Sequence, residues 1–475
     1  MTDIQLWRLS ACDLADAVAK KKVSSAEAVG AAVERMRATN GALNAVVEDL
    51  GEAAMKEAAR LDAEMAKGGP VGPLHGVPVT IKVNVDQKGC ATTNGVTALK
   101  DVIAPGDAPV VENLRRAGAV VIGRTNTPEF SFRAHTDNPL YGETKNPWGD
   151  HVSPGGSSGG AASAVMAGMG ALAHGNAFGG SLRFPAAACG AATVKPGLGR
   201  VPAYNPSQTA ERGMLAQNMS VQGLIAREAR DVRLGMKTLI GYDPHDPWMV
   251  AAPWDGPKEE GPIRVAFTKN MYGFDLHKDV EAALDAAALA LEDAGYKVCA
   301  ADLPDMKEIG YAGYAALMGE VKALMGPDIE KNGSETLRGI FAGYFAEFPP
   351  YEGLDLLKAM AKRSYYARQF SLFMSRYPLI LTPFLPQPFF APGRDAEGVE
   401  GIMETLGVAI WSYSMNYLGL PAGNIPAGFT TARGAGQPIG VQIVGRRFRE
   451  DMILDACEAV EQRVGVMAER LFAQM

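Results

Sequence analysis

The sequence predicts an α/β fold in one large domain, with a largely buried sheet covered by helices. Segments with helical periodicity alternate with short apolar segments rich in β-branched residues, which is the pattern of strands that lie between helices. These apolar segments lack the polar alternation of half-exposed strands, so we expect both faces of the sheet to be covered. No internal repeat and no long charged or proline-rich linker divides the 475 residues, which favours a single domain.

The predicted helices have start signals or amphipathic patterns. Ser10, Ser24 and Asp107 are the expected N-caps, and Glu27 completes a capping box with Ser24. The expected helices span residues 10–20, 24–37, 52–67, 107–117, 278–294 and 450–464. The expected strands span residues 77–85, 119–122, 263–267, 296–301, 379–382 and 441–444. Residues 305–375 have a mostly helical pattern, which predicts a helical elaboration of the sheet.

Composition excludes several classes of protein. The net charge of −7 argues against binding of nucleic acid or of an anionic membrane, because either needs a basic face. The five cysteines are scattered and form no CxxC pattern, so neither a disulfide framework nor a thiolate zinc site is predicted. The N-terminus lacks a signal-peptide pattern, and no apolar run reaches the roughly 20 residues of a membrane helix. We expect a soluble, cytoplasmic protein without metal or cofactor, and a homodimer remains open.

Residues 136–199 differ from the rest of the chain, because Gly, Ser, Ala and Pro dominate and charges are sparse. A flexible linker is the simplest explanation, but a linker is not expected to run directly into strand and helix patterns. Dense glycine with almost no charge instead indicates backbone packed closely against itself or against a ligand.

Two serines stand in glycine-rich surroundings within this region. Ser157 lies in the segment SPGGSSGG, residues 153–160, and Ser181 lies in FGGSLRFP, residues 178–185. Consecutive free N–H groups beside a nucleophile are what a tetrahedral oxyanion requires. For Ser181 these donors would be the amides of Phe178, Gly179 and Gly180.

A serine nucleophile needs a base, and the sequence offers an unusual one. The six histidines form no metal-ligand pattern such as HExxH. Lys82 interrupts an apolar, β-branched segment, and burial would disfavour its charged form and lower its pKa toward neutrality. A lysine in a strand is more often an edge residue whose stem is buried and whose charge reaches water, so this second interpretation stays open on the residues alone.

Several ordered motifs together resemble the amidase signature family. The family's G-P-L-x-G-x-P segment followed by lysine matches residues 72–82, its G-G-S-S-G-G matches 155–160, and its G-G-S-[IL]-R-x-P matches 179–185. Further matches lie at residues 123–130, 146–148, 195–196, 222–227, 419–422 and 438–442. The resemblance covers nearly the whole chain and is weakest at about 250–415.

The resemblance implies a single large domain with a central mixed, twisted sheet flanked by helices. Within it, residues 1–70 would be N-terminal helices and 71–245 the catalytic core. Residues 250–415 would form a variable, substrate-shaping region, and 416–475 the return to the core.

The resemblance also implies hydrolysis of a small-molecule amide without a cofactor. Ser181 would attack the carbonyl and form an acyl-enzyme. Ser157, after a cis peptide bond, would relay the proton to neutral Lys82. Ser158 would bond near Lys82, and Arg183 would hold the glycine loop.

Two positions depart from the family pattern. Ala177 stands where the family commonly has an Asp that braces the glycine loop, and Val83 stands where an Asp often follows the lysine. Asn176 is a candidate for supplying the loop support instead. A degenerate member of the family, weakly active or non-catalytic, is therefore a second hypothesis.

Four rival functions have partial support in the sequence. Residues 155–159 match the GxSxG elbow of α/β-hydrolases, but that elbow needs a strand directly before the serine, and residues 146–154 have a loop pattern. Cys189 could serve a nitrilase-like cysteine amidase, although core packing is its more common role. The glycine-rich serines could form a phosphate-binding nest. Within the family, the amidase subunit of glutamyl-tRNA amidotransferase is a rival, but its acidic stretch is SVQGL here, residues 220–224.

The variable region would decide the substrate. Large apolar and aromatic side chains recur there on predicted helices: Tyr311, Tyr314, Met318, Met325, Phe341, Tyr344 and Phe345. Ordinary core packing accounts for most of them. Those that face the site would favour an apolar or aromatic acyl group.

Overall fold

The computed structural model describes residues 5–474 and has one mixed sheet at its centre. Its order is β1-β3-β2-β4-β6-β5-β10-β11-β9-β7-β8. The strands are β1 Val46–Asp49, β2 Pro78–Lys82, β3 Val120–Thr125, β4 Leu172–Ala177, β5 Ala192–Lys195, β6 Val221–Ala226, β7 Arg264–Phe267, β8 Lys297–Ala300, β9 Leu379–Pro383, β10 Ala422–Thr430 and β11 Gln437–Gly445. β2 runs parallel to β3 and β4, whereas β6 is antiparallel to β4 and β5. The predicted single domain with a mixed sheet is confirmed.

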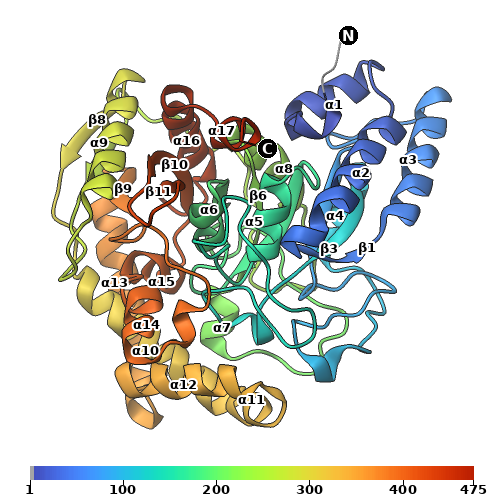
Figure 1. Ribbon diagram of the computed structural model, residues 1–475. Coiled ribbons are helices and arrows are strands. Elements are labelled where there is room, and N and C mark those ends of the chain that lie inside the picture. Colours follow the sequence, from blue (N-terminus) through green and yellow to red (C-terminus); the bar gives the residue numbers. More distant parts are fainter. Residues whose placement is uncertain (1–4, 475) are drawn as a thin grey trace.

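Helices cover both faces of this sheet (Figure 1). The first half of the chain holds α1 Ala11–Ala19, α2 Ser25–Leu43, α3 Gly51–Ala66, α4 Pro109–Arg116, α5 Gly159–Met166, α6 Arg183–Cys189, α7 Met214–Met219 and α8 Ala229–Leu239. The second half holds α9 Lys278–Asp293, α10 Met306–Leu324, α11 Gly326–Asn332, α12 Glu335–Glu347, α13 Gly353–Met374, α14 Gly398–Ile402, α15 Ile410–Tyr417, α16 Glu450–Val464 and α17 Met467–Phe472. Single-turn helices are η1 Leu6–Arg8, η2 Thr97–Leu99, η3 Glu129–Ser131 and η4 Arg394–Ala396, and η5 Met403–Gly407 is a π-helix.

Two hydrophobic cores follow from this arrangement. Side chains of α4, α8, α9 and α16 pack together on one face of the sheet, and those of α5, α6, α10 and α15 pack on the other. All five residues of β2 are buried, as the apolar run predicts for a strand covered on both faces. The group α10 to α14 extends from the sheet at the bottom of Figure 1, away from α1 to α3. The predicted helical elaboration at 305–375 is thus confirmed.

One predicted cap is wrong, and several strands were not predicted. Ser24 and Glu27 form the expected capping box, but α4 begins after Ala108 instead of at Asp107. Pro109 occupies the first turn of α4, where its fixed φ suits the helix and its missing N–H costs nothing. Asp107 instead accepts a hydrogen bond from the N–H of Lys88 at 2.7 Å. The strands β1, β4, β5, β6 and β10 had no predicted counterpart, because sheet pairing overrides weak local signals in short or glycine-containing segments.

Candidate active site

Lys82 is the last residue of β2, and its side chain is fully buried. The neighbouring residues Val79, Ile81 and Val83 are buried with it. Burial disfavours the ammonium form and holds the pKa of Lys82 well below its ordinary value. The interpretation in which this lysine reaches water is therefore wrong, and burial favours the neutral amine over the ammonium.

Ser157 and Ser158 meet this amine from the loop that leads into α5. The Gly156–Ser157 peptide bond is cis, as the family resemblance implies. The Nζ atom of Lys82 lies 2.6 Å from Oγ of Ser157 and 3.1 Å from Oγ of Ser158. No strand precedes Ser157, since residues 146–158 form loop structure, so the α/β-hydrolase elbow does not fit.

Asn176, on β4, completes the surroundings of the amine. Its Oδ1 atom accepts a hydrogen bond from Nζ of Lys82 at 2.9 Å. All three hydrogen-bond partners of Nζ are thus neutral groups. Val83 and Ala177 are buried apolar side chains, so the two positions where the family usually has carboxylates leave the amine without a negative partner.

Ser181 follows β4 in a glycine loop that leads into α6. Its carbonyl oxygen accepts a hydrogen bond from the N–H of Ser158 at 3.3 Å, which joins the two serine segments. Within residues 5–474, the N–H groups of Phe178, Gly179 and Gly180 donate no hydrogen bond. Three consecutive free amides before a serine are the arrangement that an oxyanion requires. Within the same range, no hydrogen bond joins the hydroxyls of Ser157 and Ser181.

The glycine loop is held by Ser412 of α15. The Ser412 hydroxyl donates to the carbonyl oxygen of Gly179 at 2.8 Å. Arg183 binds this helix, because its guanidinium donates to the Ser412 carbonyl oxygen at 2.9 Å and to Oδ1 of Asn416 at 2.5 Å. The same guanidinium donates to Oε1 of Gln442 on β11 at 2.6 Å. Burial lowers the pKa of Arg183 to about 9.

Aromatic rings gather beside the glycine loop. The rings of Phe178 and Phe132 meet edge to face at 5.5 Å, and Phe132 lies 5.3 Å from Phe341 of α12. Phe345 packs against Phe341 in turn. Of the aromatic residues predicted in the variable region, Phe341 and Phe345 therefore belong to this group. Tyr314 and Tyr344 are buried in the core, and Tyr311 is exposed.

Phe132, Asn84 and Ser412 were missed by sequence reasoning. Phe132 and Asn84 stand close to motif residues, but their contacts cross the fold and leave no local pattern. The positive φ angles of Phe130 and Ser131, which turn the chain before Phe132, are likewise invisible in the sequence.

Other candidate groups do not gather at this site. Cys189 is fully buried, its thiol lies 3.6 Å from the Pro154 carbonyl oxygen, and burial raises its pKa, which makes it a poor nucleophile. His174 is buried against Gln222, and burial lowers its pKa to about 3. In the described part of the chain, no three His, Cys, Asp or Glu side chains are grouped as metal ligands.

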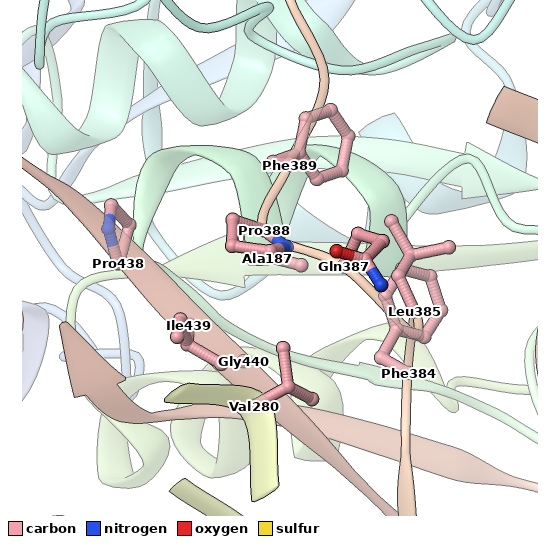
Figure 2. A pocket seen from close by; sticks show the side chains of 10 residues that line it. All are labelled: Ala187, Val280, Phe384, Leu385, Gln387, Pro388, Phe389, Pro438, Ile439 and Gly440. Carbon is pink, nitrogen blue, oxygen red and sulfur yellow. The ribbon is translucent and has the colours of Figure 1, made fainter. Parts of the chain in front are cut away.

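Two of the cavities among residues 5–474 have strand residues in their lining. The smaller encloses about 20 Å³, room for about one water molecule and far too little for a substrate (Figure 2). It is lined by Ala187, Val280, Phe384, Leu385, Gln387, Pro388, Phe389, Pro438, Ile439 and Gly440. The larger, of about 460 Å³, lies between the segment that joins β5 to β6 and residues 244–248, and its lining includes Val221. Val221 pairs with Ala177, the last residue of β4, so this cavity lies near the end of β4 from which the glycine loop continues.

This fold and site define the class: the chain belongs to the amidase signature family. The family model described as Amidase matches residues 27–454. The chain is 46% identical to an indoleacetamide hydrolase from Bradyrhizobium diazoefficiens over 471 residues, which cover 99% of this chain and 89% of that protein. It is 34% identical to an acylamidase from Rhodococcus erythropolis over 96% of this chain and 95% of that protein. A glutamyl-tRNA(Gln) amidotransferase subunit from Moorella thermoacetica is 32% identical over 97% of both chains.

A solved structure agrees with these relatives. The structure of 6-aminohexanoate cyclic dimer hydrolase complexed with substrate matches with a TM-score of 0.81 and 27% identity, over 97% of this chain and 98% of that one. The protein is an amidase, an enzyme that hydrolyses amide C–N bonds. Among residues 5–474, no helix has the length and apolar character to cross a membrane.

Proposed function

We propose that the amidase works through an acyl-enzyme on Ser181, with Ser157 as proton relay and Lys82 as base. The observation that carries this proposal is the fully buried Lys82 amine, 2.6 Å from the Ser157 hydroxyl. A lysine kept neutral by burial can accept a proton near pH 7, which an exposed lysine cannot do. The free amides of the loop before Ser181 supply the matching electrophilic site.

In acylation, the Ser181 Oγ attacks the amide carbon and gives its proton to Ser157, which passes its own proton to Nζ of Lys82. The carbonyl oxygen becomes an oxyanion and accepts hydrogen bonds from the N–H groups of Phe178, Gly179 and Gly180. The proton then returns through Ser157 to the amide nitrogen, the C–N bond breaks, and the amine or ammonia leaves.

Deacylation uses the same groups. A water molecule attacks the ester carbon and gives a proton through the relay to Lys82. The second oxyanion collapses, the proton returns to Oγ of Ser181, and the carboxylic acid leaves. Each cycle consumes one amide and one water, and it restores the neutral amine of Lys82.

We propose a primary amide of an arylacetic acid as the substrate, with indoleacetamide as the first candidate. The relative at 46% identity is an indoleacetamide hydrolase and covers 99% of this chain. The rings of Phe132, Phe178 and Phe341 form an aromatic group beside the loop that would hold the oxyanion. Edge-to-face contacts to an aromatic acyl group favour such a substrate over an aliphatic one.

Variants test the catalytic roles directly. Ser181→Ala should lower kcat for indoleacetamide by about 10⁴-fold and abolish the acyl-enzyme detected by intact mass after acid quench. Lys82→Ala should lower kcat at pH 7 by about 10² to 10⁴-fold. Ser375→Ala, which changes an exposed serine at the end of α13, is the matched control and should keep wild-type activity. Full activity in either site variant would refute the mechanism.

The substrate is tested with matched amides. Specificity constants for indoleacetamide, phenylacetamide and hexanamide should fall in that order, and the aromatic amides should be at least about tenfold better. Equal constants, or a preference for hexanamide, would refute the arylacetamide proposal and leave the amidase chemistry untouched.

The amidase component of a glutamyl-tRNA amidotransferase is the second candidate, supported by 32% identity over 97% of both chains. That function predicts glutamine as the ammonia source and a requirement for partner proteins. Hydrolysis of indoleacetamide by the isolated chain, without measurable glutaminase activity, would exclude it. A cytoplasmic location and a homodimer stay predictions, to be checked by fractionation and by the mass in solution.

A further inference from the structure

The amine of Lys82 has three neutral hydrogen-bond partners, and a neutral amine can form three such bonds. A neutral lysine carries two N–H groups and one lone pair, and its partners here are Ser157, Ser158 and Asn176. Ser158 donates its hydroxyl hydrogen to the backbone carbonyl oxygen of Asn176 at 3.3 Å. Toward Lys82, Ser158 therefore acts as an acceptor. The Oδ1 atom of Asn176 can only accept. Both N–H groups are thereby used, and the lone pair is left for the Ser157 hydroxyl.

The orientation of the Asn176 side chain is set by Asn84. The two amides bond reciprocally, with Nδ2 of Asn176 donating to Oδ1 of Asn84 at 2.9 Å and Nδ2 of Asn84 donating to Oδ1 of Asn176 at 3.2 Å. A rotated Asn176 amide would bring its NH₂ group against an N–H of Lys82. The reciprocal pair opposes this rotation, because a rotated Asn176 amide would also place its NH₂ group against the NH₂ group of Asn84.

Asn84 is anchored in its turn by Ser131. The second hydrogen of Nδ2 of Asn84 is donated to Oγ of Ser131 at 3.0 Å, and Ser131 donates onward to Oδ1 of Asn94 at 2.6 Å. Ser131 has a φ of 59° and directly precedes Phe132 of the aromatic group. One directed chain of hydrogen bonds thus runs from Lys82 to the turn that presents Phe132.

We propose that Asn176 and Asn84 are positioning residues for the base: this amide pair aims the lone pair of Lys82 at Ser157. The pair gives Lys82 uncharged partners in a site where Val83 and Ala177 supply no carboxylate. The inference rests on the proposed role of Lys82 as base. A loop support alone, the simpler role for Asn176, would leave the protonation behaviour of Lys82 unchanged.

The charged and titratable groups around Lys82 define what a new charge would do. Arg124 on β3 is a buried cation, and His174 on β4 is neutral near pH 7 because burial lowers its pKa to about 3, so neither supplies a negative charge. Asn176→Asp would therefore bring the first carboxylate into hydrogen-bond range of Nζ and raise the pKa of Lys82. Because catalysis needs the neutral amine, the acid limb of the kcat profile should move to higher pH.

The experiment compares Asn176→Leu, Asn176→Asp and Asn84→Leu by pH profiles of kcat and KM with indoleacetamide. Asn176→Leu removes the acceptor at similar volume and should lower kcat by about 10- to 100-fold, with KM changed less than about threefold. Asn84→Leu should lower kcat by about three- to tenfold. Asn176→Asp keeps an oxygen acceptor, so its kcat should recover at alkaline pH. Asn332→Leu, at the end of α11, is the matched control and should leave the profile unchanged.

Two further variants separate the possible failures. Lys82→Met and Ser181→Ala are measured in the same series, and activity in these two would refute the proposed function itself. The positioning role alone is refuted under a different outcome. In that outcome Lys82→Met and Ser181→Ala are inactive, Asn176→Leu keeps the wild-type kcat, and Asn176→Asp leaves the acid limb of the kcat profile unshifted. Asn84→Leu leaves the direct contacts of Lys82 in place, so it keeps the test decisive if Asn176→Leu does not fold.

Discussion

At Lys82, the stability of the fold and the availability of a basic amine place opposite demands on burial. A buried lysine destabilises the folded protein when it is charged, yet burial is what makes the amine available as a base. The structure meets both demands with neutral partners. Ser157, Ser158 and Asn176 can each accept from an ammonium, and the Ser157 hydroxyl can instead donate to the lone pair of the neutral amine. The absence of a carboxylate from the partners of Nζ therefore favours a low pKa and is compatible with activity.

The lowered pKa of Lys82 predicts a pH dependence of stability. Between this lowered pKa and the ordinary lysine value near 10.4, the unfolded chain binds one proton more than the folded chain. The free energy of unfolding should therefore rise with pH in this window, with a contribution from Lys82 of up to about 1.4 kcal/mol per pH unit. Lys82→Met removes this contribution.

Urea unfolding of wild type and Lys82→Met at pH values from about 6 to 9 measures the difference. The wild type should show the steeper rise, and all other groups cancel in the comparison. Equal slopes for the two proteins would mean that Lys82 keeps its ordinary pKa in the fold.

At the scale of elements, the glycine loop before Ser181 depends on a helix that is distant in sequence. The loop between β4 and α6 lies against α15, where Ser412 binds the Gly179 carbonyl oxygen. A Cβ atom on Gly180 would lie 2.3 Å from Oγ of Ser412 and 2.6 Å from the ring of Phe184, whereas a Cβ on Gly179 would meet nothing within 4 Å. Gly180 is thus required for close packing, whereas the space beside Gly179 could hold a side chain.

Gly180→Ala should displace the loop, because neither Ser412 nor the Phe184 ring can yield without losing its own contacts. We expect a loss of about 1–3 kcal/mol in the free energy of unfolding and a fall in kcat of about 100-fold. Gly179→Ala is the matched control, with a stability change within about 0.5 kcal/mol. Urea unfolding and kcat measure both variants, and equal stability losses would show that the α15 contact does not shape the loop.

At the scale of the whole molecule, the site draws on segments far apart in the chain. Phe132 follows η3, Phe178 follows β4, and Phe341 comes from α12 of the helical region. That region also supplies α10, which packs against α15 behind the glycine loop. The prediction that residues 250–415 shape the substrate pocket gains a specific candidate in Phe341.

Phe341→Ala should weaken the recognition of aromatic acyl groups. Loss of one ring contact at 5.3 Å from Phe132 should lower kcat/KM for indoleacetamide by about tenfold while hexanamide changes less than about threefold. Phe373→Ala, which removes a buried ring from α13, controls for general loss of packing. If both amides lose equally in Phe341→Ala, the ring serves packing and not selection.

The sequence alone predicted the class of fold and the family, which the structure and the relatives confirm, and it singled out Lys82, Ser157 and Ser181 as the proposed catalytic set. These were readable because apolar periodicity and glycine-rich motifs are local patterns, and the resemblance placed them in order along the chain. Strands such as β4 and β10 escaped prediction, because their pairing partners, and not their own residues, stabilise them.

Only the tertiary structure decided what surrounds these three side chains. The burial of Lys82, its bond to Asn176 and the Asn84 pair depend on β2 and the loop after it lying beside β4, segments about 90 residues apart. The contact of Ser412 with the glycine loop joins positions more than 230 residues apart. Such contacts are set by the packing of whole elements, and packing leaves no local pattern from which spacing could reveal them.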